Sequence, residues 1–157
     1  MHRVYTYGWK GWQSFGILVL RLIVGAAFIL HGWPKIQNPL HWMDKMGSGM
    51  PPILQLASAL AEFGGGIALI LGFLTPIAAG ALAINMCFAL ALVSFPRGDT
   101  FVSPTGGNSF ELPLVYLAIM TALFFVGPGR FSLDSRLWKP RYVVVHEREI
   151  PAAAKAA

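Results

Sequence analysis

The sequence predicts an all-α, polytopic membrane protein with four transmembrane helices in an antiparallel bundle and both termini in the cytoplasm. The first observation is the composition, because 55% of the 157 residues are hydrophobic and only 12% are charged. A soluble domain carries about twice that charged fraction, about 25%, and the mean hydropathy of +0.59 points the same way. The second observation is a series of four apolar runs, and the third is a concentration of basic residues near both chain ends.

The apolar runs that we expect to cross the membrane cover residues 15–33, 53–74, 77–95 and 111–127. Crossing the hydrocarbon core takes about 20 predominantly apolar residues, and the fourth run is the shortest. Between the second and third runs, Leu74-Thr75-Pro76 indicates a tight hinge, since proline suits the first turn of a new helix. The predicted organisation is an interfacial N-terminal segment at 1–14, a four-helix membrane domain at 15–129 and a cytoplasmic tail at 130–157.

The distribution of basic residues predicts the orientation in the lipid bilayer. Cytoplasmic segments of membrane proteins carry an excess of Lys and Arg. The two terminal segments together carry eight such residues: Arg3, Lys10, Arg130, Arg136, Lys139, Arg141, Arg148 and Lys155. The loops on the other side carry three, Lys35, Lys45 and Arg97. Both termini are therefore expected in the cytoplasm, as an even number of spans also requires.

Several other kinds of chemistry are excluded by what the sequence lacks. Cys87 is the one cysteine, so neither an intramolecular disulfide nor a cysteine-based metal site can form. The basic residues do not alternate with aromatic residues along a stripe, which excludes a nucleic-acid partner. No run of His, Asp and Glu has the spacing of metal ligands, and no glycine-rich phosphate loop is present. We expect no metal ion and no covalently bound cofactor.

Small residues recur at every fourth position in two of the runs. These positions are Ala57, Ala61 and Gly65 in the second run and Ala79, Ala83, Cys87 and Ala91 in the third. Helices in lipid associate through close packing at such positions. The stripes predict either a close antiparallel pair of these two helices or a homo-oligomer contact.

Polar side chains inside the runs are the candidate ligand-binding or proton-handling residues, and no catalytic residue is assigned. They are Arg21, His31, Lys35, Glu62, Asn85, Glu111 and Tyr116. Ionisable groups at this depth are costly and persist where they pair, face a cavity or serve a function. From a rise of about 1.5 Å per residue, we expect Arg21 to pair with Glu62, with Asn85 as a third member. The pair would either serve a ligand or lock the bundle, and Arg21 could instead extend toward the cytoplasm.

A second polar group is expected near the outer surface. His31 and Glu111 lie at similar heights in their runs, and Lys35 follows one turn after His31. One broad side of the first helix carries these polar residues together with Gly25 and Gly32. An imidazole titrates near neutral pH, which would suit proton exchange with a redox or transported ligand.

These motifs together resemble the DoxX family of small membrane proteins. The signature R-L-x-x-G-x-x-F-x-x-H-G-x-x-K at 21–35 is similar to the opening of that family. Further similar motifs follow in the same order: EFGGG at 62–66, LGFLT at 71–75, AINM at 83–86, ELP at 111–113 and GPGRFSLD at 127–134. The resemblance covers about residues 15–134.

The resemblance implies a four-helix protein of the bacterial inner membrane, related to proteins linked with quinone-dependent sulfur oxidation and with oxidoreductase complexes. The main hypothesis is a membrane subunit of a quinone-linked oxidoreductase system, with the quinone or another apolar ligand in the bundle and the electrons from partner subunits. One alternative is a non-enzymatic scaffold or assembly factor that binds partners through its tail. The other is a small-molecule or proton carrier that acts as an oligomer.

Overall fold

The computed structural model describes residues 11–44, 47 and 49–138. Its helices are α1 (Gly11–Ile36), α2 (Pro52–Leu71), α3 (Thr75–Ala89), α4 (Glu111–Val126) and the short α5 (Leu133–Leu137). A π-helix, η2 (Leu90–Ser94), continues α3. The described residues contain no strand, only an isolated bridge between Thr100 and Ser109. The predicted all-α class is therefore confirmed.

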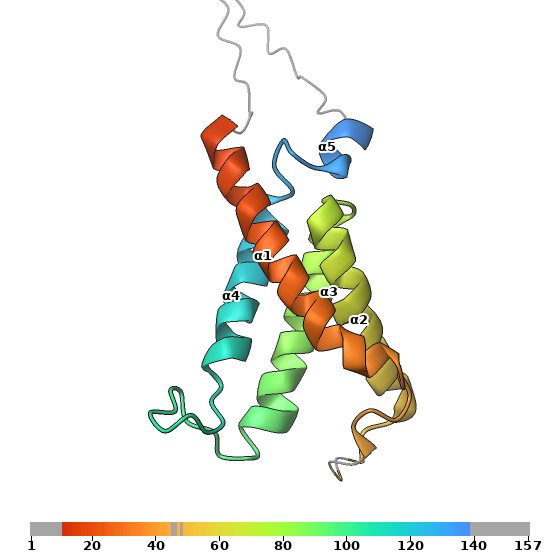
Figure 1. The fold of residues 1–157 in the computed structure, drawn as a ribbon, viewed down its shortest axis with the longest axis vertical. Coiled ribbons are helices and arrows are strands. Elements are labelled where there is room, and N and C mark those ends of the chain that lie inside the picture. Colours follow the sequence, from red (N-terminus) through yellow and green to blue (C-terminus); the bar gives the residue numbers. More distant parts are fainter. Residues whose placement is uncertain (1–10, 45–46, 48, 139–157) are drawn as a thin grey trace, which may run out of the picture.

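Three helices of the described chain are long and apolar enough to cross a membrane: α1, α2 and α3 with its extension η2. The fourth, α4, is equally apolar but has 16 residues, which corresponds to about 24 Å at a rise of about 1.5 Å per residue. Figure 1 shows α1 lying diagonally across α2 and α3, with α4 beside α3. Both ends of the described chain lie at one end of the molecule, and the described parts of the loop after α1 (37–44 and 49–51) and the loop 96–110 lie at the other.

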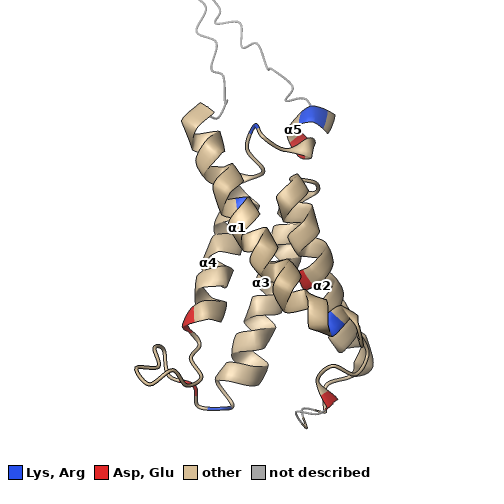
Figure 2. Cartoon of the chain, in the orientation of Figure 1, with Lys and Arg blue, Asp and Glu red and all other residues tan. Residues whose placement is uncertain are grey.

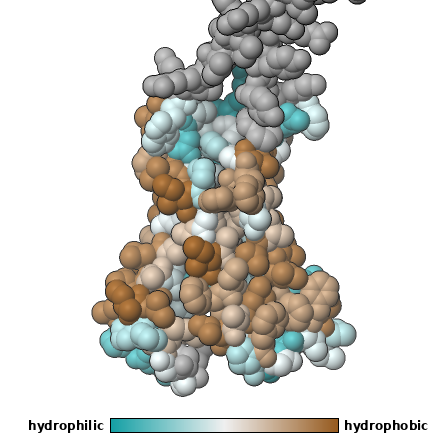
Figure 3. Space-filling view, turned by 180° about the vertical axis from the view of Figure 1, so that it is seen from behind, coloured by the Kyte–Doolittle hydropathy of each residue, from teal (hydrophilic) through white to brown (hydrophobic). Residues whose placement is uncertain are grey.

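The outer surface is what a bilayer requires. Charged residues are sparse along the helices and mostly lie toward the two ends of the molecule (Figure 2). Seen from behind, apolar side chains cover the middle of the molecule and polar ones gather at its ends (Figure 3). Large apolar side chains such as Ile23, Leu30 and Phe125 are 65%, 74% and 79% exposed. Water would oppose this exposure, whereas lipid tails accept it.

Helix α1 extends further than the predicted span at both ends. It continues through Pro34 and ends at Ile36. Proline removes one backbone donor and strains the preceding turn, but the helix continues past it. Lys35 is therefore helical rather than part of the connecting loop, and its side chain reaches Glu62 of α2.

The closest helix contact is between α1 and α2, and glycines make it possible. A Cβ added at Gly66 would lie 2.7 Å from the carbonyl oxygen of Gly25, and one at Gly25 would lie 2.8 Å from the oxygen of Gly66. Further along α1, a Cβ at Gly32 would lie 2.6 Å from the backbone nitrogen of Phe63. The two backbones therefore touch directly, because only glycine leaves room for such an approach.

The small-residue stripes predicted a close antiparallel pair of α2 and α3 or a homo-oligomer contact, and only part of them lies where α2 and α3 touch. Gly65 does contact Leu82 of α3, and Ala79 is buried. However, Ala57 and Ala61 line a cavity between the two helices, and Cys87 is exposed. The spacing of small residues showed that backbones can approach, but it could not show which neighbour approaches.

We predict that Gly66→Ala destabilises the protein by about 1–3 kcal/mol, the usual cost of overpacking a tight contact. The added methyl group would meet backbone atoms of Gly25 and Ile29 as well as the Ile29 side chain, and the backbone of α1 cannot move away easily. Titration with a denaturing detergent, followed by circular dichroism, measures the free energy of unfolding.

The matched control is Gly64→Ala in the same helix, where an added Cβ has nothing within 4 Å. This change should be neutral, or stabilising by up to about 1 kcal/mol through helix propensity. Equal effects of the two substitutions would contradict the proposed importance of the α1–α2 contact.

Candidate functional site

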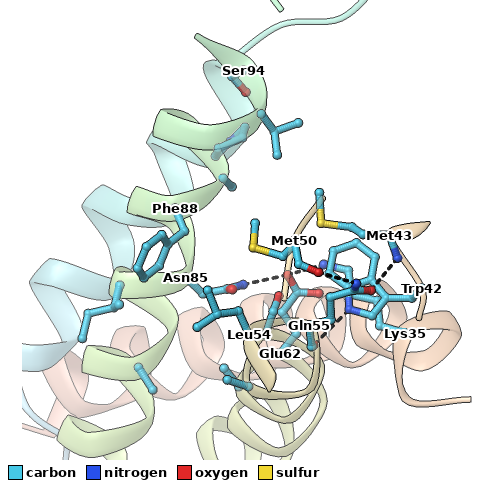
Figure 4. Close-up of a pocket in the computed structure, with 18 of the residues that line it drawn as sticks. Lys35, Trp42, Met43, Met50, Leu54, Gln55, Glu62, Asn85, Phe88 and Ser94 are labelled. Atoms are coloured by element: carbon cyan, nitrogen blue, oxygen red, sulfur yellow. Dashed lines mark hydrogen bonds and ion pairs between the residues drawn. The ribbon is translucent and has the colours of Figure 1, made fainter. Parts of the chain in front are cut away.

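The carboxylate of Glu62, in the middle of α2, is the centre of the polar network. Its side chain is 5% exposed, and its Oε1 accepts hydrogen bonds from Lys35 Nζ at 2.6 Å and from Asn85 Nδ2 at 2.8 Å. Lys35 comes from α1 and Asn85 from α3, so the carboxylate connects three helices (Figure 4). Its other oxygen, Oε2, is buried without a hydrogen-bond partner. A buried carboxylate oxygen left unpaired is energetically costly.

Lys35 is held on its other side by an aromatic ring. Its Nζ lies 4.3 Å from the ring centroid of Trp42, a geometry in which the ring attracts the cation. The Trp42 indole N–H in turn donates to the backbone oxygen of Gln55 at 3.0 Å. The ammonium group is therefore fixed between α2 and the loop that follows α1.

Gln55 holds this loop against α2. Gln55 is 1% exposed. Its Oε1 accepts a hydrogen bond from the Met43 backbone N–H at 2.8 Å. Its Nε2 donates to Asp44 Oδ1 at 2.8 Å and to the Met50 carbonyl at 3.0 Å. Hydrogen bonds from Gln55 and then from His41 lower the pKa of Asp44. The loop thus forms a fixed wall beside the Lys35–Glu62 pair.

A cavity of about 520 Å³ opens beside this pair, between α2, α3 with η2, and the loop. Lys35, Gln55, Glu62 and Asn85 lie together on one part of its wall, and Ser58, Ser94, Arg97 and Ser109 also line it. Most of the remaining lining is apolar, including Trp42, Met43, Met50, Leu54, Ile84, Phe88 and Val93. The π-helix contributes Val93 and Ser94 to this wall. A single π-helical turn widens a helix locally and often occurs at functional sites.

A second cavity of about 140 Å³ lies on the other side of the pair. Lys35 and Glu62 line both cavities, and the second one is also lined by His31 and Tyr116. The rings of His31 and Tyr116 meet edge to face, with centroids 6.2 Å apart. The ion pair therefore lies between a large, mostly apolar cavity and a small one with titratable side chains.

Arg21 does not reach Glu62, so the predicted ion pair between them is wrong. Its Nε and Nη2 donate to the carbonyls of Leu69 and Ile70, at 2.8 and 3.1 Å. Its Nη1 donates to Pro128 and Phe131, at 2.6 and 3.0 Å. The last carbonyls of a helix have no partner within the helix, and a guanidinium with five donors can serve several of them. Arg21 therefore binds the end of α2, two turns away from Glu62.

The same turn is bound from the other side by Asp134. Its two carboxylate oxygens accept from the backbone N–H groups of Leu74 and Thr75, at 2.7 and 2.8 Å, at the start of α3. An anion at a helix N-terminus and a cation at a C-terminus both match the helix dipole. Gly72, with φ of 65°, turns the chain between them, and a Cβ there would collide with the guanidinium of Arg21.

The predicted grouping of His31, Lys35 and Glu111 is only partly reproduced. His31 lies beside Lys35 in the wall of the small cavity. Glu111 begins α4 with an exposed side chain and lines neither cavity. Lys35 pairs with Glu62 instead, because the close contact between α1 and α2 brings the C-terminal end of α1, where Lys35 lies, against α2.

Two residues of the network were not among the sequence candidates. They are Trp42 and Gln55. A buried amide in an otherwise apolar run is a signal that could have identified Gln55. Among the described residues, no group of three or more His, Cys, Asp or Glu side chains could hold a metal ion.

The fold and this network define a class: a small, multi-pass helical membrane protein with an ion pair buried between two cavities. The chain belongs to the DoxX family, whose family model matches residues 16–94. It is similar to the inner membrane protein YqjF of Escherichia coli, with 32% identity over 133 residues, 83% of this chain and 98% of the relative. An uncharacterised protein of Haemophilus influenzae is 31% identical over 82% of this chain and 95% of its own length.

A third relative carries a functional name, "Putative oxidoreductase CatD" of Bacillus subtilis, and is 30% identical over 80% of this chain and 90% of its own length. No solved structure matches the chain. Family membership, the relatives named as inner membrane proteins and the three long apolar helices show a multi-pass protein of the bacterial inner membrane, in contact with the lipid bilayer.

We predict that Lys35→Met destabilises the protein by about 3 kcal/mol, because it leaves the buried Glu62 carboxylate without its cation. Adding Glu62→Gln to this variant should recover part of the loss, since the uncompensated charge is then removed. Unfolding free energies of the two single variants and the double variant give the coupling energy.

Arg136→Met provides the control for removing a positive charge, because Arg136 is exposed on α5. Its effect should stay within about 0.5 kcal/mol. Strictly additive effects of the Lys35 and Glu62 substitutions would show that the ion pair contributes nothing to stability.

Proposed function

We propose that this protein binds a quinone, or a similar apolar ligand with a polar head, in the large cavity, as the membrane subunit of an oxidoreductase system. The observation that carries the proposal is the cavity of about 520 Å³, apolar over most of its wall and polar at the Lys35–Glu62–Asn85 network. Ligand sites are typically concave and apolar with a few convergent polar groups. A quinone has this division, with a polar head and an apolar chain.

The polar network would orient the head of the ligand, while the apolar wall holds its chain. A bound quinone supplies two-electron, two-proton redox chemistry, and we assign the supply of electrons to a partner subunit. Glu62 is placed to hold or release a proton beside the head, and His31 and Tyr116 lie in the small cavity behind it. The oxidoreductase name of the Bacillus subtilis relative agrees with this class of function.

We further propose that α4 also crosses the membrane and that both chain ends face the cytoplasm. The two ends of the described chain lie together, at the opposite end from the loops 37–51 and 96–110. Arg130 and Arg136 lie at that same end, and the sequence adds further basic residues in both terminal segments. The excess of positive charge there favours the cytoplasmic side.

The ligand site is tested by filling the cavity. We predict that Ala57→Phe, in its wall, lowers the affinity of the purified protein for decylubiquinone and its reduced form at least about tenfold, equivalent to about 1.4 kcal/mol. Calorimetric titration in detergent measures the affinity.

Ala118→Phe, at an exposed position of α4 outside both cavities, adds the same side chain as a control and should leave the affinity unchanged. Absence of binding to the unmodified protein, or an equal loss in both variants, would overturn the site.

The topology is tested with reporter fusions. We predict that alkaline phosphatase fused after Pro104 is active, and that green fluorescent protein fused after Trp138 fluoresces, because the loop 96–110 and residue 138 would lie on opposite sides of the membrane. The exchanged fusions serve as controls and should be silent. An active phosphatase at both positions would show that α4 does not cross.

A further inference from the structure

The hydrogen-bonding state of Glu62 bears on which form of a redox-active ligand the large cavity prefers. Glu62 Oε1 accepts two hydrogen bonds, whereas Oε2 accepts none and is closed to solvent. The terminal torsion of a glutamate side chain is soft, so either oxygen can turn toward a group in the cavity that Glu62 lines. This wall therefore offers an acceptor that the described residues leave unpaired.

The nearest hydrogen-bond donors in the wall already have partners, and two of them donate to Glu62 itself. Lys35 Nζ is 2.6 Å from Oε1 and lies over the ring of Trp42, and Asn85 Nδ2 is 2.8 Å from Oε1. The amide of Gln55, also in the wall, donates to Asp44 Oδ1 and to the carbonyl of Met50. These groups hold one another in place, as Figure 4 shows.

The two redox forms of a quinone differ in this respect. An oxidised quinone head carries carbonyl oxygens, which only accept hydrogen bonds, whereas a quinol head carries two hydroxyl groups, which also donate. A hydroxyl placed against Glu62 would satisfy its free acceptor with a charge-assisted hydrogen bond. A carbonyl in the same place would face a carboxylate oxygen to which it cannot donate, so it would leave that acceptor unpaired and could use only the N–H groups that Lys35 and Asn85 do not give to Glu62.

We propose that the large cavity selects the reduced, hydroxyl-bearing form of its ligand, and that Glu62 is the residue that determines this selectivity. The inference rests on the proposed quinone-binding function. The inference names the redox form that the cavity holds. Because selective binding of the quinol stabilises the reduced form, the bound quinone becomes easier to reduce.

The experiment compares three probes on the full-length protein in detergent, titrated under anaerobic conditions. They are decylubiquinone, decylubiquinol and the ether of decylubiquinol in which both hydroxyls are methylated. We expect decylubiquinol to bind at least about tenfold more tightly than either of the others, because a hydrogen bond to a charged group provides that difference. The ether keeps the reduced ring but lacks the donors, so this comparison needs no mutant.

The variant Glu62→Gln then assigns the preference to one residue. An amide replaces one acceptor oxygen with an N–H donor, so the ratio of quinol to quinone affinities should fall to about one or invert. Glu111→Gln makes the same chemical change outside both cavities and should keep the ratio of the unmodified protein.

The outcomes separate the two proposals. Equal affinity for the quinol and its ether, or tighter binding of the quinone, overturns the selectivity and leaves the quinone site standing. A tenfold preference that Glu62→Gln retains in the folded variant overturns the role of Glu62. Failure of all three probes to bind the unmodified protein overturns the proposed function together with this inference.

Discussion

The buried carboxylate of Glu62 is the constraint on which the rest of the structure depends. An ionised group within a membrane-spanning helix is costly unless partners compensate it. Here Lys35 of α1 and Asn85 of α3 provide those partners on Oε1. For the lysine to reach, α1 must lie against α2, and the glycine contact between Gly25 and Gly66 allows that approach. The charge pair and the glycine crossing are thus two parts of one arrangement.

The charged residues of the membrane domain are divided between two ends with different tasks. At one end, Arg21 and Asp134 bind the backbone groups left open where α2 ends and α3 begins. These contacts also hold the segment after α4 against the α2–α3 turn. Toward the other end, Lys35 and Glu62 lie in the walls of two cavities. The geometry thus assigns Arg21 to the framework and leaves the second group in the walls of the cavities.

Most positions of the first-helix signature shared with the DoxX family have a physical role in the structure. Arg21 binds the end of α2, and Gly25 and Gly32 permit the crossing with α2. Phe28 is buried in the core and packs on Tyr116, and Lys35 neutralises Glu62. Most of the motif therefore encodes how α1 lies on α2. The part that faces a cavity is the end that carries His31 and Lys35.

The all-α class, the approximate limits of the apolar helices and the set of polar residues at depth could be predicted from the sequence, because hydropathy and helix length depend on local composition. The sequence could not give the pairing of the charges. The rise per residue left a difference in depth between Arg21 and Glu62 that an arginine side chain could largely span, but it did not include the carbonyls of Leu69 and Ile70 at the end of α2, which accept hydrogen bonds from the guanidinium. Nor did small-residue spacing reveal that α1, rather than α3, is the closest neighbour of α2. Those outcomes depend on which helix faces meet and on which backbone groups lack partners, and only the tertiary structure decides both.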